Sequence, residues 1–163
     1  MSTAIRFATP TDADAIFQLI HALAVYEEAP NAVEATPDSI RAQLEMEHPP
    51  FECVVIEDDG AIGGFALFFH NYSTWTGVQG LYLEDLFVPE KNRGRGYGKA
   101  LMAKLAQIAV ERGCARMEWQ VLDWNESAIE FYESLGAEVR RDWFPCRLDG
   151  SALSAMAGTD GKG

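Results

Sequence analysis

The segment 86–100 reads LFVPEKNRGRGYGKA, and it decides how the rest of the chain is interpreted. A predicted strand runs here into a glycine-rich turn and then into a predicted helix. Gly94, Gly96 and Gly98 stand at alternate positions, where glycine tolerates positive φ and lets bare backbone amides approach a ligand. A helix that begins after such a turn presents unsatisfied N–H groups and the positive end of its dipole. The segment therefore predicts an anion-binding loop, with phosphate as its natural ligand.

Three cationic side chains in this loop favour a diphosphate over a neutral ligand. Arg93, Arg95 and Lys99 supply donors in a chain that has only 13 Lys and Arg against 25 Asp and Glu. The glycine spacing matches neither G-x-x-x-x-G-K-[ST] nor G-x-G-x-x-G, which excludes Walker and Rossmann loops. On the loop alone, a flexible surface turn with basic side chains remains the alternative.

Periodicity on both sides of the loop predicts an α/β protein of the mixed α+β kind. The expected strands cover residues 5–8, 51–57, 61–70, 79–88, 116–122 and, as a final pair, 137–148. Helices are expected around 16–23, from a Thr36 cap, over 101–109 and from an Asn125 cap. We expect a central mixed, mostly antiparallel sheet of about six to seven strands flanked by about four helices. The whole chain, 1–163, is predicted to be one domain with a frayed tail from about Gly150.

The net charge of the chain limits the classes of partner that we expect it to bind. A formal net charge of -12 opposes binding to a phosphate backbone, so nucleic acid is not expected. The acidity either keeps the protein soluble or gathers a cationic substrate, and composition alone favours the first. No apolar run approaches the roughly 20 residues that cross a bilayer, and the first residues lack the pattern of a leader. We therefore expect a cytoplasmic protein with no membrane partner.

Cysteine and histidine spacing predicts neither disulfides nor a metal site. Cys53, Cys114 and Cys146 are odd in number and widely separated, which is typical of reduced structural thiols. No Cys or His pair has the spacing of zinc ligands.

Several motifs in order resemble the GNAT acetyltransferases. Arg93-x-x-Gly96-x-Gly98, directly after a strand, is similar to the pyrophosphate loop of that family. The stretches YLEDLFV (82–88), WNESAIEFY (124–132) and LAVYE (23–27) resemble its diamine branch, also called spermidine/spermine or thialysine acetyltransferases. The resemblance covers residues 4–148 and departs at 140–143, where the connection is shorter than is usual in the branch.

The resemblance implies the GNAT fold and acetyl-CoA as a consumed cosubstrate, with no metal. Leu86 and Val88, with Phe87 between them, are expected to bond the pantetheine arm through their backbone. Asn125 and Ser127 are expected to contact the cofactor from the opposite side. The pyrophosphate is expected at Arg93, Gly94, Arg95, Gly96, Tyr97, Gly98 and Lys99.

The resemblance also implies two catalytic residues and an amine-binding set. Tyr132 matches the tyrosine that protonates the leaving thiolate, and Glu84 matches a carboxylate that faces the amine. Tyr26, Glu27 and Asp85 match positions near the substrate amine. An alkyl amine with a pKa of about 10.4 arrives protonated and needs a base or a water relay, whereas a thiolate with a conjugate pKa of about 8.5 accepts a proton from a nearby phenol.

Each of these residues has a plainer interpretation. Tyr132 stands at helical spacing from Ile129, which alone is more typical of a core aromatic, and Glu27 alone is compatible with a solvated helix end. Glu84 and Asp85 are neighbours on a strand and point to opposite faces, so only one of them faces the substrate. We favour Glu84.

The predicted function is therefore N-acetyl transfer from acetyl-CoA to a primary amine of a small molecule, by direct attack. The alternatives are a non-catalytic acetyl-CoA sensor and a protein or peptide N-acetyltransferase on the same fold. The resemblance and the apolar stretch FALFF (65–69) further predict a homodimer.

Overall fold

The computed structural model describes residues 2–159, and within them one five-stranded sheet organises the first of two compact units. The units, Met1–Leu122 and Asp123–Gly163, are described separately. The strands are β1 (Thr3–Phe7), β2 (Glu52–Asp58), β3 (Ala61–Ser73), β4 (Val78–Phe87) and β5 (Met117–Glu118), paired in that order. The first three pairings are antiparallel and β4 pairs with β5 in parallel, so the predicted mixed, mostly antiparallel sheet is confirmed.

Strand β2 lies in the interior of the sheet, and its sequence explains why. Its residues from Cys53 to Ile56 are all buried, as expected for a strand covered on both faces. A two-residue turn links it to β3, and Asp59 adopts a φ of 50° there, a conformation that Asp tolerates better than most residues. The β2–β3 hairpin is therefore specified by local sequence.

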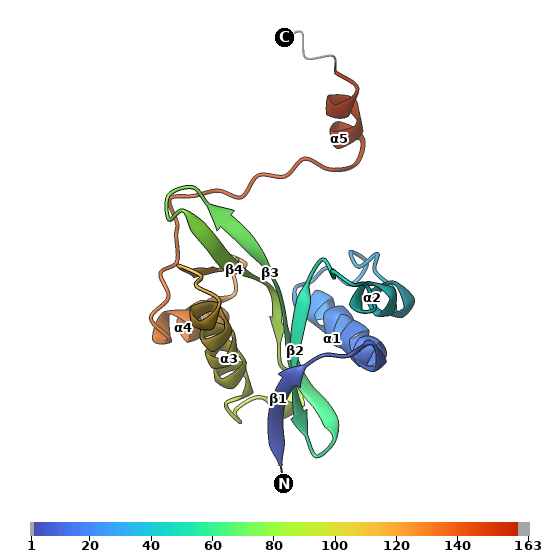
Figure 1. Ribbon diagram of the computed structural model, residues 1–163, viewed down its shortest axis with the longest axis vertical. Helices are drawn as coiled ribbons and strands as arrows, with labels where there is room; N and C mark the ends of the chain where they lie inside the picture. Colours follow the sequence, from blue (N-terminus) through green and yellow to red (C-terminus); the bar gives the residue numbers. More distant parts are fainter. Residues whose placement is uncertain (1, 160–163) are drawn as a thin grey trace. The chain divides into compact units, whose positions relative to one another are not determined.

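Helices cover both faces of this sheet (Figure 1). Helices α1 (Ala13–Tyr26) and α2 (Pro37–Leu44) lie on one face, and α3 (Tyr97–Glu111) lies on the other. The predicted Thr36 cap is confirmed, because its hydroxyl oxygen accepts from the Ser39 N–H at 3.0 Å. On the α1 side the core joins Ile16, Phe65 and Phe87 with their neighbours.

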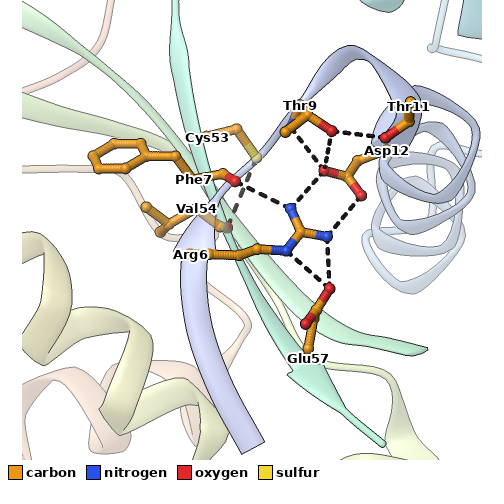
Figure 2. A network of polar contacts seen from close by, with 8 residues as sticks. All are labelled: Arg6, Phe7, Thr9, Thr11, Asp12, Cys53, Val54 and Glu57. Atoms are coloured by element: carbon orange, nitrogen blue, oxygen red, sulfur yellow. Dashed lines mark hydrogen bonds and ion pairs between the residues drawn. The ribbon is translucent and has the colours of Figure 1, made fainter. Parts of the chain in front are cut away.

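A polar network ties the first strand to the first helix (Figure 2). Arg6 on β1 donates to both oxygens of Asp12, at 2.8 and 3.0 Å, and to Glu57 on β2 at 2.8 Å. Asp12 ends the short 3-10 helix η1 (Pro10–Asp12) and also accepts from the Thr9 N–H at 2.7 Å. The hydrogen bonds from Arg6 are the main reason that the pKa of Asp12 lies below its ordinary value. This bidentate pair fixes where α1 leaves the sheet.

Three expectations at the C-terminal end are wrong. The strand expected over 116–122 is reduced to Met117–Glu118, which pairs with β4 only at Leu81 and Tyr82. The two strands expected over 137–148 are irregular, and no sheet pairing involves them among the described residues. Pro145 removes a ladder donor there, and Phe144 is 86% exposed, so this segment has no buried face that would hold a strand in register. The sheet consequently has fewer strands than expected.

The second unit contains two helices within the described residues, α4 (Glu126–Ser134) and α5 (Gly150–Ala157). The predicted Asn125 cap is confirmed, because its side chain accepts from the Ala128 N–H at 3.3 Å. Helix α5 occupies most of the tail and none of its residues is buried, so the frayed tail stays a prediction, and residues 160–163 lie outside the described residues. None of the described helices has both the length and the apolar character needed to cross a membrane.

Candidate active site

A β-bulge in β4 shapes the centre of the candidate site. Across the β3–β4 ladder Leu67 pairs with Asp85 and Phe68 pairs with Leu83, which leaves Glu84 as the extra residue on β4. A bulge of this kind bends the strand and redirects side chains, and bulges are frequent beside active sites. Glu84 is exposed, whereas Asp85 is partly buried. The resemblance to the family pointed to both carboxylates, but nothing in the sequence indicated the bulge at Glu84.

Asp85 lies in strongly perturbed electrostatic surroundings. Burial, followed by the charges of Glu84 and Glu27, raises its pKa to about 6. Burial alone raises the pKa of Glu27, at the C-cap of α1. The charge of Glu27 acts on Asp85, so the C-terminal end of α1 lies near β4 at this point. A perturbed carboxylate pair of this kind is typical of functional sites.

Aromatic rings and one arginine connect this acidic pair to the glycine-rich loop. The rings of Tyr26 and Phe87 lie 6.5 Å apart, and the Arg93 guanidinium lies over both, 5.0 Å from the first centroid and 5.8 Å from the second. Arg93 Nε also donates to the Val88 carbonyl at 3.0 Å. Arg93, which was expected among the pyrophosphate contacts, therefore directs its charged group toward the end of β4 and toward Tyr26.

The backbone of the loop has the geometry of an anion cradle. Gly94 and Gly96 have φ of 78° and 80°, values that strongly favour glycine, and Gly96 is the N-cap of α3. No atom lies within 4 Å of a Cβ built on either glycine. Among the described residues, none accepts a hydrogen bond from the backbone N–H groups of 94–99. A row of unpaired donors at the start of a 15-residue helix is suited to phosphate.

The loop is anchored on the β2–β3 hairpin through residues that sequence analysis did not single out. Asn92 Nδ2 donates to the Gly63 carbonyl at 3.2 Å. Arg95 Nη1 and the Tyr97 hydroxyl both donate to Asp58 Oδ2, at 2.8 and 2.7 Å. Asp58 was not among the predicted site residues, because nothing local links it to a loop more than thirty residues later. Lys99 and Gly98 lie in the first turn of α3, as expected.

Asn125, Ser127 and Tyr132 lie in the second unit, on and around α4, whereas Leu86 lies on β4. The Asn125 side-chain oxygen, besides capping the helix, accepts from the Ser127 hydroxyl at 3.3 Å. Tyr132 lies in the second half of the helix, with its ring 5.3 Å from that of Phe131. The roles of these three residues stay predictions.

No group of three or more His, Cys, Asp or Glu side chains within residues 2–159 is arranged to hold a metal ion. Cys53, Cys114 and Cys146 are free thiols, and Cys146 is exposed. Cys53 is buried, and burial raises its pKa to about 12.

The model of the Acetyltransferase (GNAT) family matches residues 16–137, which include the bulged strand, the loop and α4. The chain belongs to the GNAT acetyltransferase family. This acetyltransferase is 35% identical to an L-ornithine N5-acetyltransferase of Arabidopsis thaliana, over 96% of its own chain and 88% of that protein. It is 36% identical to a thialysine N-epsilon-acetyltransferase of Sus scrofa, over 96% and 98% of the two chains. The similarity to the diamine branch is thereby confirmed.

Solved structures agree with this assignment at the level of the fold. An integron cassette protein of V. cholerae superimposes on the acetyltransferase with a TM-score of 0.79 and 26% identity, over 98% and 99% of the two chains. An aminoglycoside acetyltransferase from a soil metagenome reaches a TM-score of 0.74 at 21% identity, over 90% and 97%. The chain is thus an acetyltransferase with the GNAT fold, and its relatives act on amines.

Proposed function

We propose that this acetyltransferase transfers the acetyl group of acetyl-CoA to a primary amine of a small molecule. The observation that carries the proposal is the row of backbone N–H groups at 94–99, which have no acceptor within the described chain and open the N-terminus of α3. Such a row fits a diphosphate, the charged part of coenzyme A. Acetyl-CoA supplies an activated thioester when it is bound, and the protein has to hold it and bring the amine to it.

The cluster of Glu27, Asp85 and Tyr26 supports a cationic acceptor. The charge of Glu27 raises the cost of ionising Asp85, and a protonated amine placed beside them would offset that repulsion. A carboxyl with a pKa of about 6 is mostly ionised at neutral pH and can accept a hydrogen bond from an ammonium group. It is too acidic to hold the proton of an amine whose pKa is about 10.4, so that proton has to leave through water. Exposed Glu84, at the bulge, is the proposed entry to this relay.

Direct attack by the amine, without an acyl-enzyme, is supported by the cysteines. An acyl-cysteine requires an accessible thiol of low pKa. Cys53, the cysteine beside the acidic pair, is 2% exposed and its pKa is raised to about 12. We propose Tyr132 as the acid that protonates the departing thiolate.

The names of the relatives narrow the class of amine proposed as the acetyl acceptor. They specify N5 of ornithine and the N-epsilon of thialysine, and each is the terminal amine of a short amino-acid side chain. Another relative is a spermidine/spermine N(1)-acetyltransferase-like protein of Homo sapiens, 34% identical over 94% of this chain and 23% of that protein. We therefore propose a diamine, a polyamine or a lysine-like amino acid.

Acetyl-CoA binding can be tested before any acceptor is known. Acetyl-CoA at roughly 100 times its Kd should raise the free energy of unfolding by about 2.7 kcal/mol, seen as a higher melting temperature. Gly96→Glu should abolish the rise, because a carboxylate would then face the diphosphate. Gly77→Glu is the matched control, since Gly77 also has a positive φ and open space but lies in the β3–β4 turn. A rise that survives Gly96→Glu contradicts the loop assignment.

A homodimer, a cytoplasmic location and a single domain over the whole chain stay predictions. One of the two reasons for expecting a dimer is weakened, because Phe65 and Phe68 are fully buried and need no partner subunit to cover them. The resemblance to the family still supports a dimer. Light scattering at micromolar concentration should give twice the 18.0 kDa chain mass, and a mass of one chain contradicts this proposal.

A further inference from the structure

We propose that Asp58 is a positioning residue for the diphosphate loop, residues 93–99. The inference rests on the proposed function and extends it to a residue outside the family motif. Its carboxylate holds Arg95 and Tyr97 in the arrangement that points the backbone N–H groups of the loop toward a ligand.

One oxygen atom makes both contacts. Asp58 Oδ2 accepts from Arg95 Nη1 at 2.8 Å and from the Tyr97 hydroxyl at 2.7 Å. Asp58 ends β2, where its backbone pairs with Thr3 on one side and Ala61 on the other. Two flanking strands therefore fix the position of this carboxylate, and its side chain is only 17% exposed. An acceptor held in a fixed position also restrains the two groups that donate hydrogen bonds to it.

Tyr97 carries that position into α3. It is the first residue of the helix, directly after the Gly96 N-cap, and is 7% exposed. Its ring packs against Gly63, where an added Cβ would lie 3.1 Å from the ring. Asn92 donates to the carbonyl of that same Gly63. Both sides of the loop are thus attached to the β2–β3 hairpin, and the helix N-terminus is held in place before a ligand arrives.

Two effects of the Asp58 carboxylate would weaken diphosphate binding. A carboxylate near the loop would repel a diphosphate, and it also keeps Arg95 from contacting one. The first effect is small, because Arg95 Nη1 lies 2.8 Å from Asp58 Oδ2 and neutralises its charge. The second effect competes with the loss of the charged acceptor of the buried Tyr97 hydroxyl, because the amide oxygen of Asn is an uncharged and weaker acceptor. We therefore expect removal of the carboxylate to weaken binding.

The test compares Asp58→Asn with Asp59→Asn, which changes the neighbouring carboxylate in the same way. The Asp59 side chain accepts a hydrogen bond from the Ser2 N–H, away from the loop residues. Calorimetry with acetyl-CoA should give a Kd about tenfold higher for Asp58→Asn, since a charge-assisted hydrogen bond is lost, and an unchanged Kd for Asp59→Asn. With S-acetylpantetheine, which lacks the diphosphate, kcat/KM at saturating amine should be the same for Asp58→Asn and wild type.

A second variant separates positioning from damage to the fold. Tyr97→Phe keeps the ring packing and removes one donor, so it should weaken acetyl-CoA binding by a smaller factor, and the double variant should bind no more weakly than Asp58→Asn alone. Equal or tighter acetyl-CoA binding by Asp58→Asn overturns the inference while leaving the proposed function intact. An equal loss with S-acetylpantetheine overturns it as well. Wild-type protein that does not bind acetyl-CoA overturns the proposed function itself, and the inference with it.

Discussion

Replacing Asp85 with Asn should stabilise the acetyltransferase, and the gain should grow with pH. The pKa of Asp85 is raised from an ordinary value of 3.8 to about 6 by burial and by the charges of Glu84 and Glu27. Between these two values the folded protein binds more protons at this site than the unfolded chain does. Stability therefore falls as pH rises through this window, and the cost is constant above it. Asn has no charge to bury, so the substitution removes the cost.

The size of the effect follows from the same pKa. Linkage gives an upper limit of roughly 3 kcal/mol at about pH 8 and roughly half of that at about pH 5. Water screens part of the cost because Asp85 is only partly buried, so we expect a gain of about 1 to 2 kcal/mol at the higher pH.

Urea unfolding of wild type and Asp85→Asn across this pH range measures the difference directly. Asp59→Asn is a matched control at an exposed carboxylate, and it should give a smaller gain at the higher pH. A gain in the free energy of unfolding that is equal at both ends of the range, or a loss at the higher pH, would refute the inference that ionised Asp85 destabilises the fold.

Three further substitutions test other residues. Tyr132→Phe should lower turnover by roughly 10²-fold or more with little change in the Kd of acetyl-CoA; wild-type turnover in the folded variant removes the assignment. Glu84→Gln should shift the pH dependence of the rate, because it deletes the proposed start of the proton relay, and an unshifted profile counts against that role. Asp12→Asn should lower the free energy of unfolding at neutral pH by about 2 kcal/mol by breaking the Arg6 pair, whereas Asp14→Asn, at an exposed carboxylate, should change it little. The pKa of Asp12 is depressed, so this difference should shrink as pH falls below about 4.

Local chemistry explains what the sequence predicted well. Thr36 and Asn125 cap helices through their own side chains, and the cap depends on residues only three positions away. Gly96 begins α3 because it supplies a positive φ that other residues resist. Features of this kind are readable from short windows of sequence.

Long-range contacts explain what it did not predict. The bulge at Glu84 depends on how β4 pairs with β3, and the anchoring of the loop depends on Asp58, which is separated from Tyr97 by 39 positions. Arg93 has the charge that a phosphate site needs, yet it lies over Tyr26 and Phe87 because the fold brings those rings to it. The segment 137–148 alternates like a strand but pairs with no strand among the described residues, and alternation alone supplies no partner.

Acetyl transfer to an amine can be followed at both of its products. The protein is incubated with acetyl-CoA and one amine at a time: ornithine, lysine, thialysine, a diamine or a polyamine. The amount of free thiol released is compared with the amount of N-acetylated product measured by mass spectrometry. We expect thiol and N-acetyl product to form in equal amounts with at least one primary amine, and blocking that amine should stop both. Thiol release that no amine raises above the rate without protein, in a preparation that binds acetyl-CoA, would contradict this expectation.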